Sequence, residues 1–210
     1  MLGAGWLRPA ETELDYVGAY RVNRTKFPTR FEEFTWVRQS LMGLGGPWTL
    51  LDAATGFNPE IHFLSNILAD DGHNVFATDL NPATMEMPGH PRIKRLVEDI
   101  RHSSSPDEVV DCWVCISVLE HMPPEAQIEC LQEAYRQLKP GGFLLLTLDE
   151  EAPSSITRKV ASVGFLTGDA VDESKAKLPT PVTYLIAQKP CASSPPSSPE
   201  TKPTDTSPAS

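Results

Sequence analysis

The sequence predicts an α/β fold in which a doubly wound, mostly parallel sheet follows a helical N-terminal segment. Three observations support this prediction. Short continuous apolar runs alternate with amphipathic helical segments, several runs end in an acidic residue, and turn-forming residues separate them. Apolar runs without polar alternation are typical of strands buried on both faces, as in parallel sheets covered by helices.

Residues 1–47 are expected to form helices and loops that cover the sheet domain. Thr29 and Glu32 fit a capping box at a helix start. The helix that follows carries apolar residues at helical spacing, namely Phe31, Phe34, Val37 and Leu41. A glycine cluster beginning at Gly43 is expected to end this helix. An earlier helix is expected around residues 11–20.

From Trp48 onward, strands and helices are expected to alternate. The expected strands, in chain order, are 49–53, 74–78, 93–97, 112–117, 143–148 and 182–188. Asn58 is a good N-cap and Pro59 suits the first helical position, so a helix is expected to follow the first strand and to end at Gly72. Its buried stripe is expected to comprise Ile61, Leu64 and Leu68.

Two further helices are expected, one opening at the proline pair of residues 123–124 and one over 154–163. In the first, one buried face is expected to comprise Ile128, Leu131, Tyr135 and Leu138. Residues 139–142, Lys-Pro-Gly-Gly, predict a turn before the fifth strand. Three prolines in 82–91 argue against a full crossover helix between the second and third strands.

The chain has 210 residues, of which 40% are hydrophobic, and its formal net charge is -10. This length predicts one main folded domain with a sizeable core. The negative charge argues against nucleic acids and anionic membranes as partners. No apolar run reaches the roughly 18 residues of a membrane span. The N-terminus lacks the charged-then-apolar layout of a secretory signal, so a cytoplasmic location is expected.

Residues 190–210 are predicted to be disordered, because fifteen of these twenty-one residues are Pro, Ser or Thr. Such a segment cannot bury enough apolar surface to offset its ordering entropy. The folded sheet domain is therefore expected to span 48–189.

The four cysteines are too few and too unevenly placed for a disulfide framework. Cys112 and Cys115 have the spacing of a redox pair. In a strand, however, residues three apart face opposite sides, whereas a redox pair belongs at a helix start. Both are predicted to be small core residues.

Acidic residues follow several predicted strands, and doubly wound sheets bind ligands at these carboxyl ends. Asp79 follows the second strand and is predicted to accept hydrogen bonds from both hydroxyls of a ribose. Its alternative role is to cap the turn at Asn81. Asp99 follows the third strand and is predicted either to bind an adenine amino group or to be an exposed acid.

The turn after the first strand, residues 54–58, contains only one glycine, Gly56. A dinucleotide would require a Gly-x-Gly-x-x-Gly turn whose backbone cradles pyrophosphate. Glu60 at the expected helix start would repel phosphate. The turn therefore favours a nucleoside without phosphates, and the acidic rim would tolerate a cation. No metal-binding pattern is identified.

The order and spacing of these segments resemble the class I S-adenosylmethionine-dependent methyltransferases over residues 48–189. The segments that carry the resemblance are 50–56 (Leu-Leu-Asp-Ala-Ala-Thr-Gly), 75–79, 98–100, 111–122 and 138–143. The resemblance implies a Rossmann-like domain that binds S-adenosyl-L-methionine. The cofactor-binding positions that it implies are Asp52, Ala54, Thr55, Gly56, Asp79, Leu80, Asp99, Ile100 and Ser117.

Two positions depart from the family pattern, because Ala54 and Asn58 stand where the family usually has glycine. The methyl group of alanine still permits close approach of a ligand. Asparagine tolerates unusual backbone angles and can also cap a helix.

The implied function is transfer of the sulfonium methyl group to a nucleophilic atom of a small-molecule acceptor. Because this methyl group is already activated, the protein chiefly aligns the acceptor. A general base helps only when the acceptor carries a proton of high pKa. His121 is the nearest titratable candidate for this base. Its alternative role is to hold the loop after the fourth strand in place. That strand lacks the Asn/Asp-Pro-Pro-aromatic motif common among base-modifying relatives, which disfavours nucleic-acid acceptors.

Two other functions stay open. A non-catalytic S-adenosylmethionine-binding pseudoenzyme is compatible with Ala54 and Asn58. A nicotinamide-dependent oxidoreductase is disfavoured by the missing glycines and by the absence of a Tyr-x-x-x-Lys pair. The sequence does not predict the acceptor or the oligomeric state.

Overall fold

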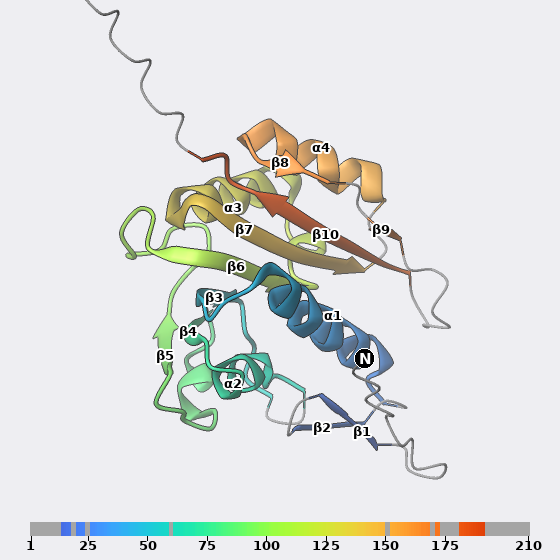
Figure 1. The fold of residues 1–210 in the computed structure, drawn as a ribbon, viewed down its shortest axis with the longest axis vertical. Helices are drawn as coiled ribbons and strands as arrows, with labels where there is room; N and C mark the ends of the chain where they lie inside the picture. Colours follow the sequence, from blue (N-terminus) through green and yellow to red (C-terminus); the bar gives the residue numbers. More distant parts are fainter. Residues whose placement is uncertain are drawn as a thin grey trace, which may run out of the picture.

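A computed structural model describes residues 14–17, 20–23, 26–58, 61–149, 152–168, 171–172 and 181–191. Its centre is an eight-stranded sheet with strand order β5-β4-β3-β6-β7-β10-β8, in which β9 also pairs with β10 (Figure 1). The strands of this sheet are β3 (Thr49–Ala53), β4 (Asn74–Asp79), β5 (Ile93–Val97), β6 (Val110–Ile116), β7 (Leu138–Asp149), β8 (Leu166–Thr167), β9 (Val171–Asp172) and β10 (Val182–Gln188).

The sheet is mostly parallel, which confirms the predicted fold class. Strands β5, β4, β3, β6 and β7 pair in parallel, and β10 pairs antiparallel with β7, β8 and β9. The chain passes from β3 to β4 on one side, whereas β6 joins β3 on the other side. The strand order therefore reverses beside β3, and such a switch opens a crevice at the carboxyl ends of the strands.

Helices cover both faces of the sheet (Figure 1). Helices α1 (Pro28–Leu44) and α2 (Leu64–Asp70) pack on one face, and α3 (Pro124–Gln137) and α4 (Pro153–Val163) pack on the other. Two 3-10 turns, η1 (Pro82–Glu86) and η2 (Leu119–His121), follow strand ends. As the prolines predict, the described chain between β4 and β5 contains only η1. No helix in the described ranges is long and apolar enough to cross a membrane.

The core consists of two clusters separated by the sheet, because successive strand residues point to opposite faces. Leu50 and Val114 belong to the cluster under α1 and α2, whereas Leu51 and Trp113 belong to the cluster under α3 and α4. Cys112 and Cys115 fall into opposite clusters, and both are buried free thiols. The prediction that they are core residues is confirmed.

The N-terminal segment differs from the expectation. Strands β1 (Leu14–Val17) and β2 (Tyr20–Asn23) form an antiparallel hairpin where a helix over 11–20 was expected. This expectation is wrong over the described part, because hairpin pairing overrides weak local helix preference. Helix α1 begins at Pro28 with Phe27 as its N-cap and without a side-chain cap, so the Thr29 capping box is also wrong. Proline suits a first helical position, which moves the start upstream.

Helix α2 begins later than expected, at Leu64. The carbonyl oxygen of Asn58 accepts hydrogen bonds from the backbone N–H groups of Ile61 and His62, at 3.1 and 2.7 Å. These bonds close a turn rather than continuing a helix, so Ile61 lies outside α2. Pro59 and the residues of the predicted tail beyond Cys191 lie outside the described ranges.

The buried face of α3 is rotated from the predicted one. Its buried residues are Ala126, Gln127, Cys130, Leu131, Ala134 and Gln137, whereas Ile128 and Tyr135 are only partly buried. Gln137 accepts a hydrogen bond from the indole N–H of Trp113 at 3.1 Å. A buried polar partner on the sheet therefore helps to set which face of α3 turns inward.

The predicted turn at 139–142 is a four-residue bulge inside β7 rather than a break before this strand. Val110 pairs with Leu138 and Cys112 pairs with Phe143, so one residue of β6 faces four residues of β7. A Cβ atom on Gly142 would lie 2.9 Å from two backbone carbonyl oxygens, so only glycine fits there. Turns and bulges use the same residue types, which explains the error.

Candidate functional site

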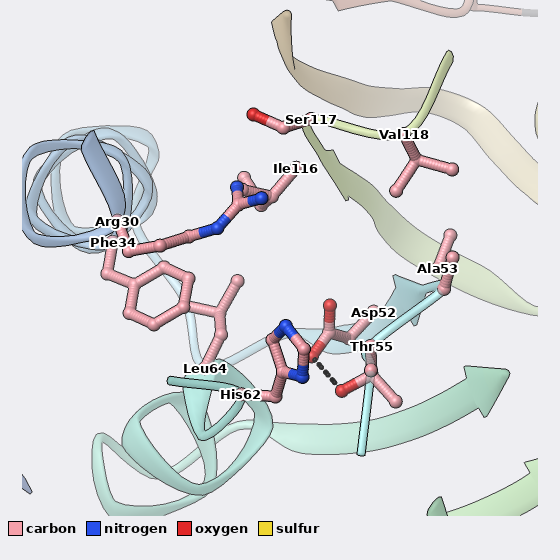
Figure 2. Close-up of a pocket in the computed structure, with 12 residues that line it drawn as sticks. Arg30, Phe34, Asp52, Ala53, Thr55, His62, Leu64, Ile116, Ser117 and Val118 are labelled. Atoms are coloured by element: carbon pink, nitrogen blue, oxygen red, sulfur yellow. Dashed lines mark hydrogen bonds between the residues drawn. The ribbon is translucent and has the colours of Figure 1, made fainter. Parts of the chain in front are cut away.

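A cavity of about 150 Å³ opens at the switch point of the sheet, between α1 and the carboxyl ends of β3 and β6 (Figure 2). Residues 52–56 line it from the end of β3 and the following turn, and 116–118 line it from the end of β6. Arg30 and Phe34 line it from α1, and His62 lines it from the segment before α2. The cavity therefore joins α1, the segment from β3 to the start of α2, and the end of β6, which are distant from one another in sequence.

The turn after β3 is held by bonds to β4 and its carboxyl end. Ala54 and Gly56 both adopt left-handed backbone conformations, with φ of 54° and 76°. The N–H of Thr55 donates to the carbonyl oxygen of Thr78 at 2.9 Å. The N–H of Gly56 donates to Oδ2 of Asp79 at 2.8 Å. The two predicted binding elements, the turn and the acid, are therefore joined directly.

The next two amides of this turn also have partners in the protein. The backbone N–H groups of Phe57 and Asn58 both donate to Nδ1 of His62, at 3.0 and 2.9 Å. Every backbone N–H from 55 to 58 is thus satisfied internally. A pyrophosphate-binding turn needs such amides to face the ligand.

Asp52 is buried at the cavity wall, with 3% of its surface exposed. The hydroxyl groups of Ser65 and Thr55 donate to its Oδ2 at 2.5 and 3.0 Å. Burial raises the pKa of this carboxyl to about 6, and the two hydroxyl bonds oppose the rise. Asp52 therefore organises the cavity wall through hydroxyl groups from two elements.

Asp79 retains acceptor capacity. Its Oδ1 accepts the backbone N–H of Asn81 at 2.8 Å, and its Oδ2 accepts that of Gly56. Each carboxylate oxygen has two lone pairs, so each can accept a further hydrogen bond. The capping role toward Asn81 is therefore real and leaves room for a ligand. The neighbouring Leu80 is 67% exposed.

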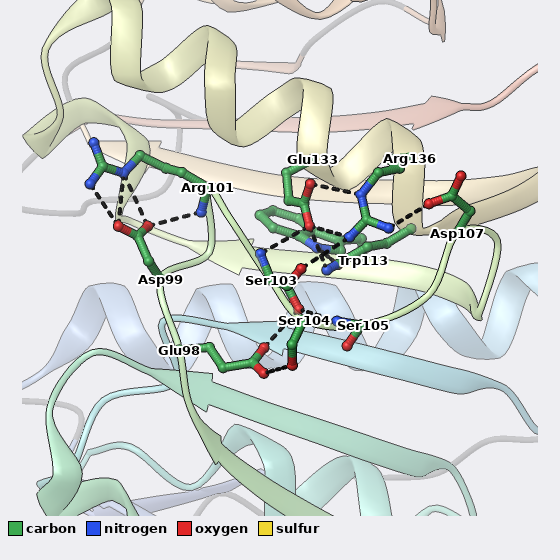
Figure 3. A network of polar contacts seen from close by, with 11 residues as sticks. Glu98, Asp99, Arg101, Ser103, Ser104, Ser105, Asp107, Trp113, Glu133 and Arg136 are labelled. Carbon is green, nitrogen blue, oxygen red and sulfur yellow. Dashed lines mark hydrogen bonds and ion pairs between the residues drawn. The ribbon is translucent and has the colours of Figure 1, made fainter.

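Asp99 is held by Arg101 (Figure 3). The backbone N–H, Nε and Nη2 of Arg101 donate to the Asp99 carboxylate at 2.9, 3.0 and 2.6 Å. The bonded Arg101 side chain holds the pKa of the Asp99 carboxyl below its usual range. Asp99 and the buried Ile100 line a separate small hollow with Trp113. The structure does not bring these two residues into the cavity of Figure 2.

Helix α1 is tied to the ends of β6 and β7 by Glu33, which is fully buried. The hydroxyl groups of Ser117 and Thr147 both donate to its Oε1 at 2.5 Å. Nη1 of Arg30 donates to its Oε2 at 2.7 Å. Burial raises the pKa of Glu33, and Arg30 and the two hydroxyls oppose the rise. Ser117, whose φ is 47°, is thereby held in a left-handed conformation at the cavity wall.

His121 lies in η2 with an exposed side chain and is not among the cavity-lining residues. Its neighbour Glu120 is partly buried, and Oε1 of Glu120 accepts the backbone N–H of Asp149 at 2.9 Å. Glu120 thus joins the loop after β6 to the end of β7. The roles predicted for His121 stay predictions.

Of the predicted positions, the cavity brings together Asp52, Ala54, Thr55, Gly56 and Ser117. The sequence analysis missed Arg30, Glu33 and His62. Glu33 lies four residues before Val37 on the buried stripe of α1, so a charge on an apolar stripe was the available signal. His62 carried no signal, because its contacts depend on the shape of the preceding turn.

Comparisons with known proteins agree with this fold. A family model described as a methyltransferase domain matches residues 61–146. A search of curated proteins finds no match to the chain. Several solved structures share the fold of this chain at low sequence identity.

A methyltransferase from Burkholderia thailandensis, 1,6-didemethyltoxoflavin-N1-methyltransferase, was solved with 1,6-didemethyltoxoflavin and S-adenosylhomocysteine bound. It is 16% identical, with a TM-score of 0.62 over 85% of this chain and 100% of that chain. The cyclase SpnF is 17% identical, with a TM-score of 0.64 over 75% and 80% of the two chains.

A Haloferax volcanii protein solved in complex with the Trm112 methyltransferase activator is 13% identical, with a TM-score of 0.64 over 79% and 92% of the two chains. The described chain therefore has the class I methyltransferase fold, as its motifs predict, and residues 61–146 match the methyltransferase domain.

Proposed function

We propose that this protein is an S-adenosylmethionine-dependent methyltransferase that acts on a small-molecule acceptor. The observation that carries the proposal is the cavity at the switch point of the sheet. Residues 52–56, from the family-like segment 50–56, line it together with Ser117. The match of 61–146 to a methyltransferase domain supports the same assignment.

The residues that follow β3 and β4 fit a nucleoside cofactor without phosphates. Asp79 has acceptor capacity for ribose hydroxyls, and the exposed Leu80 offers apolar surface to a base. The internally satisfied amides of 55–58 disfavour a pyrophosphate, and with it a nicotinamide dinucleotide. S-adenosylmethionine supplies a methyl group that is already activated, so the protein chiefly aligns the acceptor with it.

We assign Arg30 to the amino-acid end of this cofactor. Arg30 lines the cavity and donates only Nη1 to Glu33 among its described hydrogen bonds. A guanidinium group has five N–H donors, so donors remain for a carboxylate. Glu33 fixes the orientation of this guanidinium from behind.

The acceptor is assigned to the space beneath α1, where Phe34, Ile116 and Val118 add apolar surface to the cavity wall. There the protein aligns the acceptor with the sulfonium methyl group. The Burkholderia neighbour, whose structure holds 1,6-didemethyltoxoflavin, supports a small-molecule acceptor. His121 is the candidate general base. A kcat that rises less with increasing pH in His121→Ala than in the original protein would support that role.

A second candidate is a cofactor-binding protein without methyl transfer. Ala54 favours it, since a non-glycine residue stands in a left-handed conformation within the binding turn. The neighbour SpnF is a cyclase, so proteins of this fold carry more than one activity.

Calorimetry of the full chain with S-adenosylmethionine and with NAD tests the proposal. We expect saturable binding of S-adenosylmethionine and none of NAD, and the absence of S-adenosylmethionine binding at millimolar concentration would overturn it. Turnover with a panel of small-molecule acceptors then separates the enzyme from a non-catalytic binder. Mass spectrometry of the purified protein checks for bound cofactor or its demethylated product.

Asp79→Ala is expected to weaken S-adenosylmethionine binding by about 1–3 kcal/mol, because it leaves the polar partners of the carboxylate without a hydrogen-bond acceptor. Glu125→Ala is the matched control, since it removes an exposed carboxylate from the first turn of α3, away from the cavity. Equal affinities for the two variants would show that the ribose is assigned wrongly.

A further inference from the structure

His62 forms a contact with the turn after β3 that none of the family motifs describes. Its ring accepts two consecutive backbone N–H groups of the turn, from Phe57 and Asn58. We propose that His62 is a positioning residue that holds 56–58 in the cofactor-binding conformation, and that proton binding to its ring releases this turn. The inference rests on the proposed function, because the ligand is the cofactor named there.

The contact between His62 and Asn58 is reciprocal. The Asn58 N–H donates to Nδ1 of His62 at 2.9 Å, and the His62 N–H donates to the Asn58 carbonyl oxygen at 2.7 Å. The Phe57 N–H reaches the same Nδ1 at 3.0 Å. Two donors on one ring nitrogen require that nitrogen to carry no proton, so the neutral ring carries its proton on Nε2.

Packing adds to this bond pattern. A Cβ atom on Gly56 would lie 2.3 Å from Nδ1 of His62, so the ring rests directly against the glycine backbone. Gly56 is therefore required both by its φ of 76° and by the His62 ring. Where family members have further glycines, this chain has Ala54 and Asn58. His62 supplies the constraint that shapes the turn.

A proton on Nδ1 would point at two N–H donors, and both bonds would break. Burial lowers the pKa of His62, Arg30 lowers it further, and Asp79 opposes the change. The charged groups that face this ring among the described residues are Arg30 on α1, Asp79 after β4 and Asp52 in the shared cavity. The unfolded or released ring has a pKa near 6.5. The held turn is therefore fully stable above that pH and loses stability as the pH falls.

Hydrogen exchange of the Phe57 and Asn58 amides, measured by NMR on the full chain without ligand, tests the turn itself. In the original protein we expect protection at pH 7.5 and its loss near pH 5.5, after correction for intrinsic exchange rates. His62→Asn places an amide oxygen near the Nδ1 position and does not titrate, so protection is expected at both pH values. His62→Ala is expected to lose protection at both.

S-adenosylmethionine binding by calorimetry tests the consequence for the cofactor. We expect affinity to fall about tenfold between pH 7.5 and 5.5 in the original protein, which equals about 1.4 kcal/mol. His62→Asn should bind equally at both pH values, and His62→Ala should bind weakly at both. Glu125→Ala, which removes an exposed carboxylate away from the cavity, is the second control and should retain the pH dependence of the original protein.

The outcomes separate the two proposals. If the original protein binds S-adenosylmethionine but His62→Ala binds equally well at pH 7.5, the inference about His62 is wrong and the proposed function stands. A pH profile of His62→Asn that matches the original protein overturns it as well. If nothing binds S-adenosylmethionine, the proposed function fails, and loss of amide protection in His62→Ala with retention in His62→Asn still decides whether His62 holds the turn. Should His62→Ala not fold, the comparison with His62→Asn alone is decisive.

Discussion

At the scale of single residues, three carboxylates that line the cavity or bond to its lining residues are stabilised by donors from the protein itself. Asp52 receives two hydroxyl bonds, Glu33 receives two hydroxyl bonds and one from Arg30, and Asp79 receives two backbone amides. Burial of such groups without donors would cost several kcal/mol. These donors come from elements on both sides of the cavity, so each carboxylate also fixes geometry.

Asp52→Asn tests the cost of burying a carboxylate here. The folded pKa of about 6 lies above the roughly 3.9 of an unfolded chain. Between these values only the folded state holds the proton, so stability falls as pH rises, by about 2–3 kcal/mol in total. We expect Asp52→Asn to be more stable than the original protein above pH 6, because its amide oxygen can still accept both hydroxyl bonds.

Urea unfolding of both proteins at pH 4.5, 5.5 and 7.5 measures this difference. The difference in unfolding free energy should grow with pH and level off above pH 6 to 7. A difference that does not change with pH would show that Asp52 is not the titrating group.

At the scale of elements, α1 is joined to the sheet by one buried carboxylate. Glu33→Gln removes the charge that faces Arg30 and leaves an amide group near the guanidinium. We expect a loss of about 2–4 kcal/mol, because removing one partner of a buried pair costs about 3–5 kcal/mol and the Arg30 side chain is still 24% exposed. Chemical denaturation at pH 7.5 gives the value.

Asp71→Asn is the matched control, because its partner Arg38 lies on the same helix as Glu33. It breaks the bidentate pair between Arg38 on α1 and Asp71 after α2, in which both side chains are more than 20% exposed. Surface pairs contribute about 0.2–1 kcal/mol, so a small loss is expected. Equal losses of unfolding free energy in the two variants would mean that the hydrogen bonds of Glu33 are not the main polar contacts that hold α1 on the sheet.

At the scale of the whole molecule, the net charge of -10 opposes polyanionic partners. Non-specific nucleic-acid binders reach dissociation constants of about 10⁻⁴–10⁻⁶ M through cationic surfaces. We expect no retardation of single- or double-stranded DNA or RNA by up to about 100 µM protein at about 50 mM salt. Binding that weakens steeply with added salt would contradict the assignment to small-molecule acceptors.

The strand positions were predictable because continuous apolar runs report burial on both faces. The expected 49–53, 93–97 and 182–188 are the observed β3, β5 and β10. The same runs place residues 52–56 and Ser117 at strand ends, so this part of the cavity wall could be predicted. The parts from α1 and from His62 could not, because there the local pattern shows only helix or turn preference.

The sequence by itself determined the doubly wound sheet, the side of it that carries the site, and the acids and the glycine of the turn, because these depend on residues a few positions apart. Only the tertiary structure decided the hairpin of β1 and β2, the inward face of α3 and the bond network of Glu33. The bonds of Glu33 join residues 84 and 114 positions apart in the chain. Such contacts follow from how helices pack on the sheet, which no local pattern specifies.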